Sequence, residues 1–556
     1  MIKKILSLFP KFLFALLWVA VPFVYEMEGW DEYNVAIGST CFSLVWLGAN
    51  LCKRVNSICV SKIDLLLCLF LIYYAINGLL NSDRTSVLNF ITFVALYAAV
   101  RFSCMQKIRP VLCMAIVTSG VVQSVLGIAQ RLQLVASNHS EFPATGSFAN
   151  PGPWGGFVCL CLLTALFCLV GSRQKKWRRI YFFACIPLFV GLVLSDSRAA
   201  WVAFFVTSVC FFLRKSSPKK IVVSVSVIVL AGSALLYLYR PSSADARVLI
   251  WRVCGQAFAG SPVTGVGTNA LERMYMYKQA DYLETASAEE RQMAADNTIA
   301  YNEPLQVLCE QGVVGFLLLA VLAYYVMKQK YSLWGALLLA YTIFSVFSYP
   351  SDCLPVYLFL PVALAFVSGS AGCHTMPFKR CYKGLGFAVV IGVLTTLTVY
   401  GVARYRAKSI LSDYFFDNDA RSSRWLDENM DLYAADKRII ALCSDILLMK
   451  GEDDRALPFL EKGTEWEPSS SALCRLGECY QRSGKTDEAE QCFRMAERMT
   501  PGIMTPRFLL FCLYRESGKD ALPPAIRTAD MRVKIENESV CTMRNEARRY
   551  IRSVGK

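Results

Sequence analysis

The sequence predicts an all-α protein in two parts, a polytopic bundle of membrane-spanning helices followed by a helical-repeat domain. Hydrophobic residues fill 55% of the 556 positions and charged residues only 18%, a balance typical of multi-span membrane proteins. Apolar runs separated by short connections continue to residue 403. Residues 404–556 are charged and contain no further run of that kind. We therefore expect a membrane domain over 1–403 and a separate domain over 404–556.

The membrane domain contains apolar runs that we interpret as about 12 to 14 spans, although several are shorter than the roughly 20 residues of a full crossing. No small-residue cleavage site follows the first run, so we interpret it as a retained helix and not a signal peptide. The runs cover residues 5–25, 36–52, 64–80, 87–100, 111–130, 154–170, 180–194, 199–213, 221–239, 307–327, 333–347, 354–367 and 385–403.

Basic residues fall in every second connection between these runs. The densest group is the R-Q-K-K-W-R-R stretch at 173–179. Cytoplasmic connections carry such an excess of Lys and Arg, which explains the net charge of +15 without a nucleic-acid partner. The alternation predicts a cytoplasmic N-terminus, and it places Arg198, the loop 240–306 and residues 404–556 on the outer, periplasmic side.

The domain at 404–556 contains a helical repeat. Small residues at fixed spacing let two antiparallel helices pack closely, and large residues fill the space between them. Fainter copies lie upstream and downstream of the clearest one. We expect an α-solenoid that binds a partner protein or braces its neighbour. The residues that fit the tetratricopeptide pattern are Leu473, Leu476, Gly477, Tyr480, Gly484, Ala489, Phe493, Ala496 and Pro501.

Cysteine and histidine give no sign of a metal site. Many of the 22 cysteines lie within apolar runs, where a thiol behaves as a small hydrophobe. Cysteines in the C-terminal domain leave a disulfide open, but we favour core filler. The only histidines are His139 and His374, and no zinc-finger spacing occurs. We expect neither a metal nor a cofactor.

The loop 240–306 is the longest polar interruption between two apolar runs. A connection of this length is too long for a simple turn and is typical of a lid or a docking surface. Its S-P-V-T-G-V-G-T-N stretch at 261–269 predicts a chain reversal. That stretch lacks the lysine of a phosphate loop, so we assign it no nucleotide role.

Three arginines near the outer surface are candidates for binding an anion. Arg198 lies at the end of an apolar run, where an arginine usually pairs or binds an anion; the alternative is an interfacial anchor that pairs with Asp196. Arg247 and Arg252 lie in the loop, and a spacing of five turns them about 140° apart on a helix. The guanidinium fork matches phosphate oxygens. Contacts with lipid headgroups or salt bridges within the loop are the competing interpretation.

Glu303 and Glu310 lie at the start of the run after the loop. A carboxylate in that position is a candidate general base. Glu303 beside Pro304 is also what ordinary helix capping predicts, and for Glu303 alone capping is the favoured interpretation.

Taken together, three segments resemble the O-antigen ligase family of bacterial membrane glycosyltransferases. The first two are T-G-S-F-A-N-P at 145–151 and S-D-S-R-A-A-W at 195–201. The third combines the R-x-x-x-W and P-x-x-G-x-G elements within 247–267 with the N-E-P-L-Q and E-Q-G-V-V-G elements within 302–315. Their order and spacing match the family over roughly residues 120–330. The resemblance implies a GT-C-like bundle in the bacterial inner membrane.

The resemblance also implies a reaction and its residues. The family transfers a glycan from a polyprenyl-pyrophosphate carrier to a lipid or protein acceptor on the periplasmic face, without metal or nucleotide sugar. Arg198 and Arg247 would hold the pyrophosphate, with Arg252 and Asn302 as further substrate contacts. The family's histidine falls at Tyr301 in this sequence.

Tyr301 departs from the family pattern, because a tyrosine with a pKa near 10 is a poor base at neutral pH. Either Glu303 or another carboxylate replaces the histidine, or the activity is altered. His139 lies in another outward loop, and we do not assign it this role. The alternatives to a ligase are a repeat-unit polymerase and a non-catalytic scaffold or transporter that recruits partners through its repeats.

Overall fold

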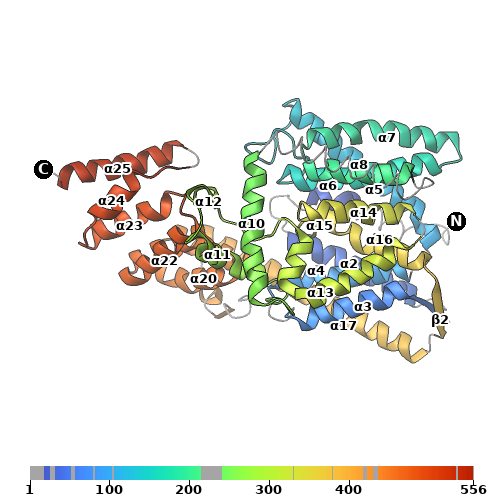
Figure 1. Ribbon diagram of the computed structural model, residues 1–556. Coiled ribbons are helices and arrows are strands. Elements are labelled where there is room, and N and C mark those ends of the chain that lie inside the picture. The colour runs from blue at the N-terminus through green and yellow to red at the C-terminus, as the bar shows by residue number, and fades with distance from the viewer. Residues whose placement is uncertain are drawn as a thin grey trace.

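The computed structural model describes residues 18–24, 32–51, 57–78, 82–102, 105–213, 241–329, 331–377, 380–417, 423–426, 428–429, 436–533 and 536–554. A large helical bundle forms one body, a smaller group of helices forms another, and helix α10 stands between them (Figure 1). This arrangement confirms the prediction of an all-α bundle with several apolar helices. Two expected spans, 221–239 and most of 5–25, lie outside the described residues.

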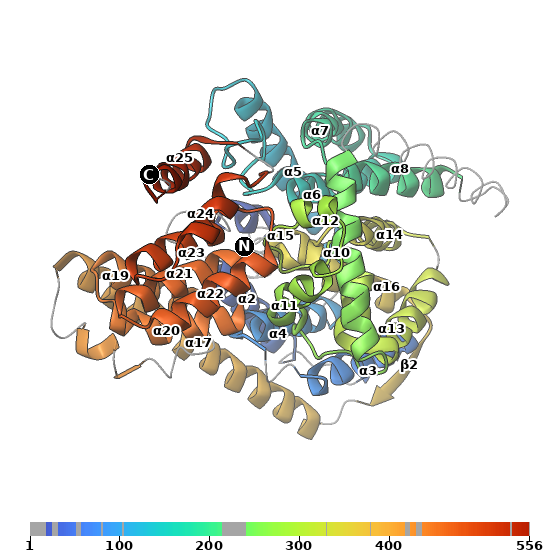
Figure 2. The same ribbon diagram turned by 60° about the vertical axis from the view of Figure 1, so that its left-hand side comes forward.

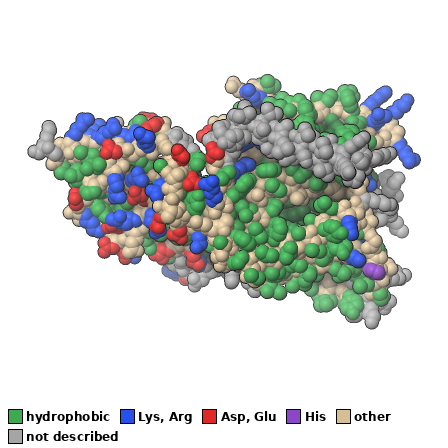
Figure 3. Space-filling view, viewed as in Figure 1, with side chains coloured by type: hydrophobic (Ala, Val, Ile, Leu, Met, Phe, Trp, Pro, Cys, Tyr) green, Lys and Arg blue, Asp and Glu red, His purple; other side chains and the backbone are tan. Residues whose placement is uncertain are grey.

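The bundle consists of apolar helices joined mostly by short connections. Five described helices are long and apolar enough to cross a membrane, and four shorter apolar helices accompany them. Hydrophobic side chains cover the visible face of the bundle (Figure 3). Its helices are α2 (Glu32–Leu51), α3 (Lys62–Ile76), α4 (Arg84–Arg101), α5 (Met105–Arg131), α6 (Pro151–Gly171), α7 (Lys175–Leu194), α8 (Arg198–Phe212), α13 (Glu303–Met327), α14 (Leu333–Val346), η2 (Pro350–Asp352), α15 (Leu354–Tyr357), α16 (Phe359–Ser370) and α17 (Arg380–Asp417).

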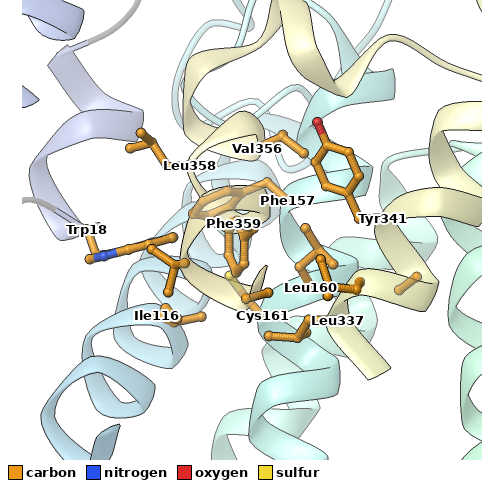
Figure 4. Packing of buried hydrophobic residues seen from close by; sticks show 14 of the residues in the cluster. Trp18, Ile116, Phe157, Leu160, Cys161, Leu337, Tyr341, Val356, Leu358 and Phe359 are labelled. Atoms are coloured by element: carbon orange, nitrogen blue, oxygen red, sulfur yellow. The ribbon is translucent and has the colours of Figure 1, made fainter. Parts of the chain in front are cut away.

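The centre of the bundle is an aromatic and aliphatic core. Phe359 of α16 meets Trp18 edge-to-face at 4.7 Å between ring centroids and Phe157 of α6 at 5.8 Å (Figure 4). Such edge-to-face pairs are favourable beyond their buried area. Ile116 of α5 and Leu337 of α14 close the cluster. This core fixes the helices that carry the outer loops.

A two-stranded sheet not expected from the sequence lies at the end of the bundle away from the C-terminal helices. Strands β1 (Ser57–Ser61) and β2 (Cys373–Pro377) pair antiparallel, with Cys59 opposite Thr375. Beside them, Arg101 donates from Nε and Nη2 to the two carboxylate oxygens of Asp64, at 3.0 and 2.9 Å. Tyr97 and Ser368 donate to the same carboxylate. This end of the bundle is therefore tied by a fully partnered ion pair.

The expected loop 240–306 is an ordered helical layer. It contains α10 (Pro241–Gly260), α11 (Leu271–Leu283) and α12 (Ala288–Met293). Figure 2 shows α11 between α22 and α10.

The C-terminal domain consists of helices that pack as successive neighbours. In the clearest pair, Gly477 of α21 allows close approach of Phe493 from α22, because a methyl group at Gly477 would lie 2.5 Å from that ring. Assignment of these helices to the tetratricopeptide class stays a prediction. The helices are α19 (Lys437–Met449), α20 (Asp453–Trp466), α21 (Ser470–Arg482), α22 (Thr486–Met499), α23 (Thr505–Glu516), α24 (Leu522–Ala529) and α25 (Glu538–Val554).

The C-terminal domain and the loop share one hydrophobic core. Tyr275 and Met276 of α11 belong to the same buried cluster as Leu473 and Met499 of the C-terminal domain. Polar contacts reinforce it: Lys437 Nζ lies 2.7 Å from the Glu272 carboxylate oxygens. The loop helices and the C-terminal helices therefore form one packed unit. Helix α17 runs unbroken past residue 403, where the sequence predicts the domain boundary.

Candidate active site

Buried glutamines hold the T-G-S-F-A-N-P loop before α6. Gln130 Oε1 accepts hydrogen bonds from the backbone N–H groups of Thr145 and Gly146, at 3.0 and 2.8 Å. Gln123 Oε1 accepts from Ser147 N at 3.0 Å, and its Nε2 donates to Ser147 Oγ at 2.8 Å. Gly146 has a φ of 61°, a backbone conformation that glycine adopts without strain. This loop is a structural element that positions the start of α6.

The turn before α8 packs onto that start. A methyl group at Gly155 would lie 2.5 Å from Ser197 Cβ, so only glycine permits the contact. Asp196 has a φ of 50°, which an Asp tolerates better than most residues. Trp201 Nε1 donates to the carbonyl of Leu192 at 2.9 Å and closes the turn. As a result Arg198 is the first residue of helix α8.

Arg247 of α10 faces the same region. Its guanidinium lies 5.7 Å from the Tyr301 ring centroid, and Trp251 Nε1 donates to Ala300 O at 3.0 Å to fix α10 against this segment. Burial lowers the pKa of Arg247, and the charge of Arg198 lowers it further. Arginine nonetheless stays protonated. The charge of Arg198, from a separate segment, therefore acts on the Arg247 guanidinium.

Within the described part of the chain, no carboxylate lies within ion-pair distance of Arg247. Its neighbours are the aromatic rings of Tyr301 and Tyr349, which meet edge-to-face at 5.2 Å. Burial also raises the pKa of the Tyr301 hydroxyl, although Arg247 opposes the shift. Tyr301 is therefore a neutral phenol at physiological pH. Its φ of 49° marks a sharp turn before α13.

The other residues predicted from the sequence lie at the edge of this region or away from it. Arg252 points to the opposite side of α10 and pairs with Glu290 at 2.5 Å. Asn302 caps α13, and its Oδ1 accepts from Leu305 N at 3.0 Å. His139 Nδ1 accepts from Glu141 N at 3.0 Å. The structure records no contact of His139 with these arginines among the residues it describes.

Glu303 opens helix α13 and faces the connection after α14. Its Oε1 accepts a hydrogen bond from the Ser351 backbone N–H at 2.6 Å, and Tyr341 Oη lies 3.3 Å from Ser351 Oγ. Asp352 follows directly and ends the short helix η2. Sequence reasoning missed Tyr349, Ser351 and Asp352. The available signal was the polar S-Y-P-S-D stretch between two apolar runs.

A kink in α13 fits the glycine turn of the loop. Gly312 has a φ of 62° within the helix, which frees carbonyl groups that would otherwise bond along it. Val266 N donates to Cys309 O at 2.9 Å, and Gly267 N donates to Glu310 O at 3.0 Å. Any side chain at Gly265 would overlap the Glu310 carbonyl. The P-x-x-G-x-G and E-x-G-x-x-G elements therefore form one joint between α10 and α13.

Asn77 of α3 completes this joint. Its Nδ2 donates to Thr264 O, Glu310 O and Gln311 Oε1 at 2.8, 3.0 and 3.0 Å. Buried polar groups are costly when unpaired, so these bonds hold Arg247 and Glu303 on rigid supports. The described residues contain no group of three His, Cys, Asp or Glu side chains that could hold a metal ion.

One family model matches part of the chain. The family model described as O-Antigen ligase matches residues 180–320. The match supports the O-antigen ligase family. No curated protein matches the chain. The matched segment contains Arg198, Arg247, Tyr301 and Glu303. The family and the apolar helices support a bacterial inner-membrane protein that carries out glycosyl transfer of the O-antigen ligase or polymerase kind.

Proposed function

We propose that this protein transfers a glycan from a polyprenyl-pyrophosphate carrier to the hydroxyl group of a lipid or protein acceptor at the periplasmic face of the membrane. The observation that carries the proposal is the position of Arg247, which lies 5.7 Å from the Tyr301 ring centroid, has no ion-paired carboxylate among the described residues, and is acted on by the charge of Arg198. An anion that binds beside two guanidinium groups offsets their mutual repulsion. A diphosphate offers enough oxygens to accept hydrogen bonds from both guanidinium groups.

The chemistry needs charge stabilisation more than proton donation at the leaving group. When the bond between the anomeric carbon and the phosphate oxygen breaks, the diphosphate keeps the electron pair and gains negative charge. Preorganised cations at that place stabilise the transition state. Arg198 and Arg247 supply this charge without a divalent ion.

A carboxylate is the preferred candidate for activating the acceptor hydroxyl. Tyr301 is a neutral phenol and holds its proton too tightly to act as a base at neutral pH. Glu303 lies two residues further along the chain, at the first turn of α13. Its hydrogen bond from Ser351 N leaves other carboxylate lone pairs for a substrate proton. Tyr301 then acts as an aromatic support for Arg247.

The proposed orientation follows from charge and packing. Exposed basic residues gather at the first turn of α7, at the opposite end of that helix from the Ser195–Ser197 turn. The loop helices share a core with the C-terminal domain. The positive-inside rule then places the arginines and the C-terminal domain in the periplasm.

The test replaces Arg198 and Arg247 separately by Ala and follows surface glycan on gels beside a deletion strain. Loss of a ligase leaves carrier-linked glycan unattached, and loss of a polymerase leaves single repeats attached. Wild-type glycan in both variants would contradict the proposal. Wild-type glycan in the deletion strain would favour the scaffold alternative or a redundant enzyme.

A further inference from the structure

A cleft of about 510 Å³ lies between α10 and α12. Pockets that hold small molecules have volumes of about 300–1,000 Å³. The side chains that line it are Asp245, Val248, Leu249, Arg252, Glu289, Glu290, Gln292 and Met293.

The cleft and Arg247 lie on different sides of helix α10. Arg252 lines the cleft and is turned about 140° from Arg247 around the helix axis. Asp245 also lines the cleft and is two residues before Arg247. The two sites are therefore at the same level along α10, separated by about one helix diameter of 10–12 Å.

One wall of the cleft is rigid. Glu290 accepts hydrogen bonds from Tyr282 Oη at 2.8 Å and from Ser287 N at 3.1 Å, and it pairs with Arg252. The C-terminal domain supports the same wall from behind, because a side chain at Gly502 would come within 2.7 Å of the Gln292 carbonyl. The wall is thus preorganised for binding.

Other groups in the cleft are available to a ligand. The side chains of Asp245, Glu289 and Gln292 make no hydrogen bond or ion pair with any residue that the structure describes. Carboxylates accept hydrogen bonds, and an amide both accepts and donates. Val248 and Met293 add an apolar surface. Hydroxyl-rich rings with apolar C–H faces match this combination.

The charge of the cleft selects among such ligands. Three carboxylates and one guanidinium line it, so its net charge is negative. Phosphate and acidic sugars are repelled, whereas neutral or amine-bearing sugars are not. The cleft therefore does not compete with the arginines for the diphosphate.

We infer that the α10–α12 cleft binds a neutral or amino-sugar saccharide during transfer. The inference rests on the proposed function, since a glycan leaving the diphosphate site would pass around α10 to reach it. The saccharide belongs either to the carrier-linked donor or to the acceptor.

The test measures KM and kcat of the full-length protein in nanodiscs. The donor is carrier-linked glycan extracted from cells that lack the gene, and the acceptor fraction comes from cells that lack the surface glycan. The variants are Glu289→Gln, Asp245→Asn and the cleft-filling Gln292→Trp. The control is Glu488→Gln, because Glu488 is likewise exposed in the first turn of a helix and has no side-chain partner among the described residues.

We expect each cleft variant to raise the KM for either the donor or the acceptor about tenfold, which is the effect of losing one net hydrogen bond. Its kcat should stay at the wild-type value. The Glu488→Gln control should have wild-type KM and kcat. A raised donor KM assigns the cleft to the donor saccharide, and a raised acceptor KM assigns it to the acceptor. If Gln292→Trp and Glu289→Gln leave both KM values unchanged while Arg247→Ala is inactive, the inference is overturned and the proposed function stands. Wild-type transfer by Arg247→Ala would overturn the proposed function itself.

Discussion

Two arginines at opposite ends of the bundle have similar surroundings and different partners. Arg101 and Arg247 are both partly buried and both lie beside tyrosines. Arg101 makes a two-pronged ion pair with Asp64. Arg247 has a tyrosine ring and a second arginine instead. A guanidinium whose charge is neutralised by a carboxylate stabilises the fold, whereas we propose that Arg247, which has no such partner among the described residues, binds an external anion.

The largest expected effect is on catalysis at the outer end. Arg247→Ala should lower the transfer rate about 10³-fold, the usual cost of removing a preorganised charge from a transition state. Its unfolding free energy should change by less than about 1 kcal/mol, because no internal ion pair is lost. Rates on carrier-linked glycan and thermal melting in detergent measure the two quantities. A rate within threefold of wild type, about 0.65 kcal/mol, would remove the distinction between the two arginines.

At the opposite end the main effect should be on stability. Arg101→Ala leaves the Asp64 carboxylate without its counter-charge, and breaking such a buried pair costs about 3 kcal/mol. Thermal melting should detect the loss, and the protein that stays folded should transfer glycan at the wild-type rate. A variant that melts like wild type would show that the pair is dispensable.

A smaller effect is expected when Arg247 keeps its charge and loses its shape. Arg247→Lys retains one positive charge but not the two parallel N–H donors. We expect a loss of about tenfold in kcat/KM, between those of the wild type and the Ala variant. Single-turnover rates with carrier-linked glycan supply the measurement. Equal rates for Arg247→Lys and Arg247→Ala would mean that the two parallel N–H donors of the guanidinium, and not its charge, account for the rate.

The smallest effect should follow from Tyr301→Phe. The raised pKa of Tyr301 means that the hydroxyl keeps its proton through and above the neutral range. Its removal should therefore change the rate by less than about threefold, or 0.65 kcal/mol, and leave the pH profile between about 6 and 9 unshifted. Rates across that range test the point. If the Tyr301→Phe variant lacks the decline in rate that the wild type shows at high pH, Tyr301 is the titrating group. Glu303 would then serve only to cap helix α13.

The sequence was sufficient where local pattern decides structure. Apolar runs predict the bundle, the Gly-rich turn at 261–269 predicts a chain reversal, and Glu303 beside Pro304 predicts a helix start. The sequence does not predict a side chain's contact when its partner is distant along the chain. Arg252 pairs with Glu290, 38 positions away, and no periodicity reveals that contact.

Tertiary pairing accounts for the other differences. Strands β1 and β2 are more than 300 positions apart, so neither short segment shows its partner locally. The connection after α14 contains Tyr349, Ser351 and Asp352, and its sequence does not differ from that of an ordinary turn. Its contact with Glu303 of α13 is evident only in the folded structure. The charged side chains after residue 403 predict a boundary there, yet helix propensity carries α17 on to Asp417.

The continuous helix α17 limits which insertions the protein can tolerate. A helix of 38 residues is a strut about 57 Å long. Inserting a single amino acid in its outer half would swing everything beyond it by about 100°, which would pull the last seven helices off the layer that carries Arg247. The length of α17 at this point is therefore as constrained as any residue of the candidate active site, and substitutions should be tolerated more readily there than insertions.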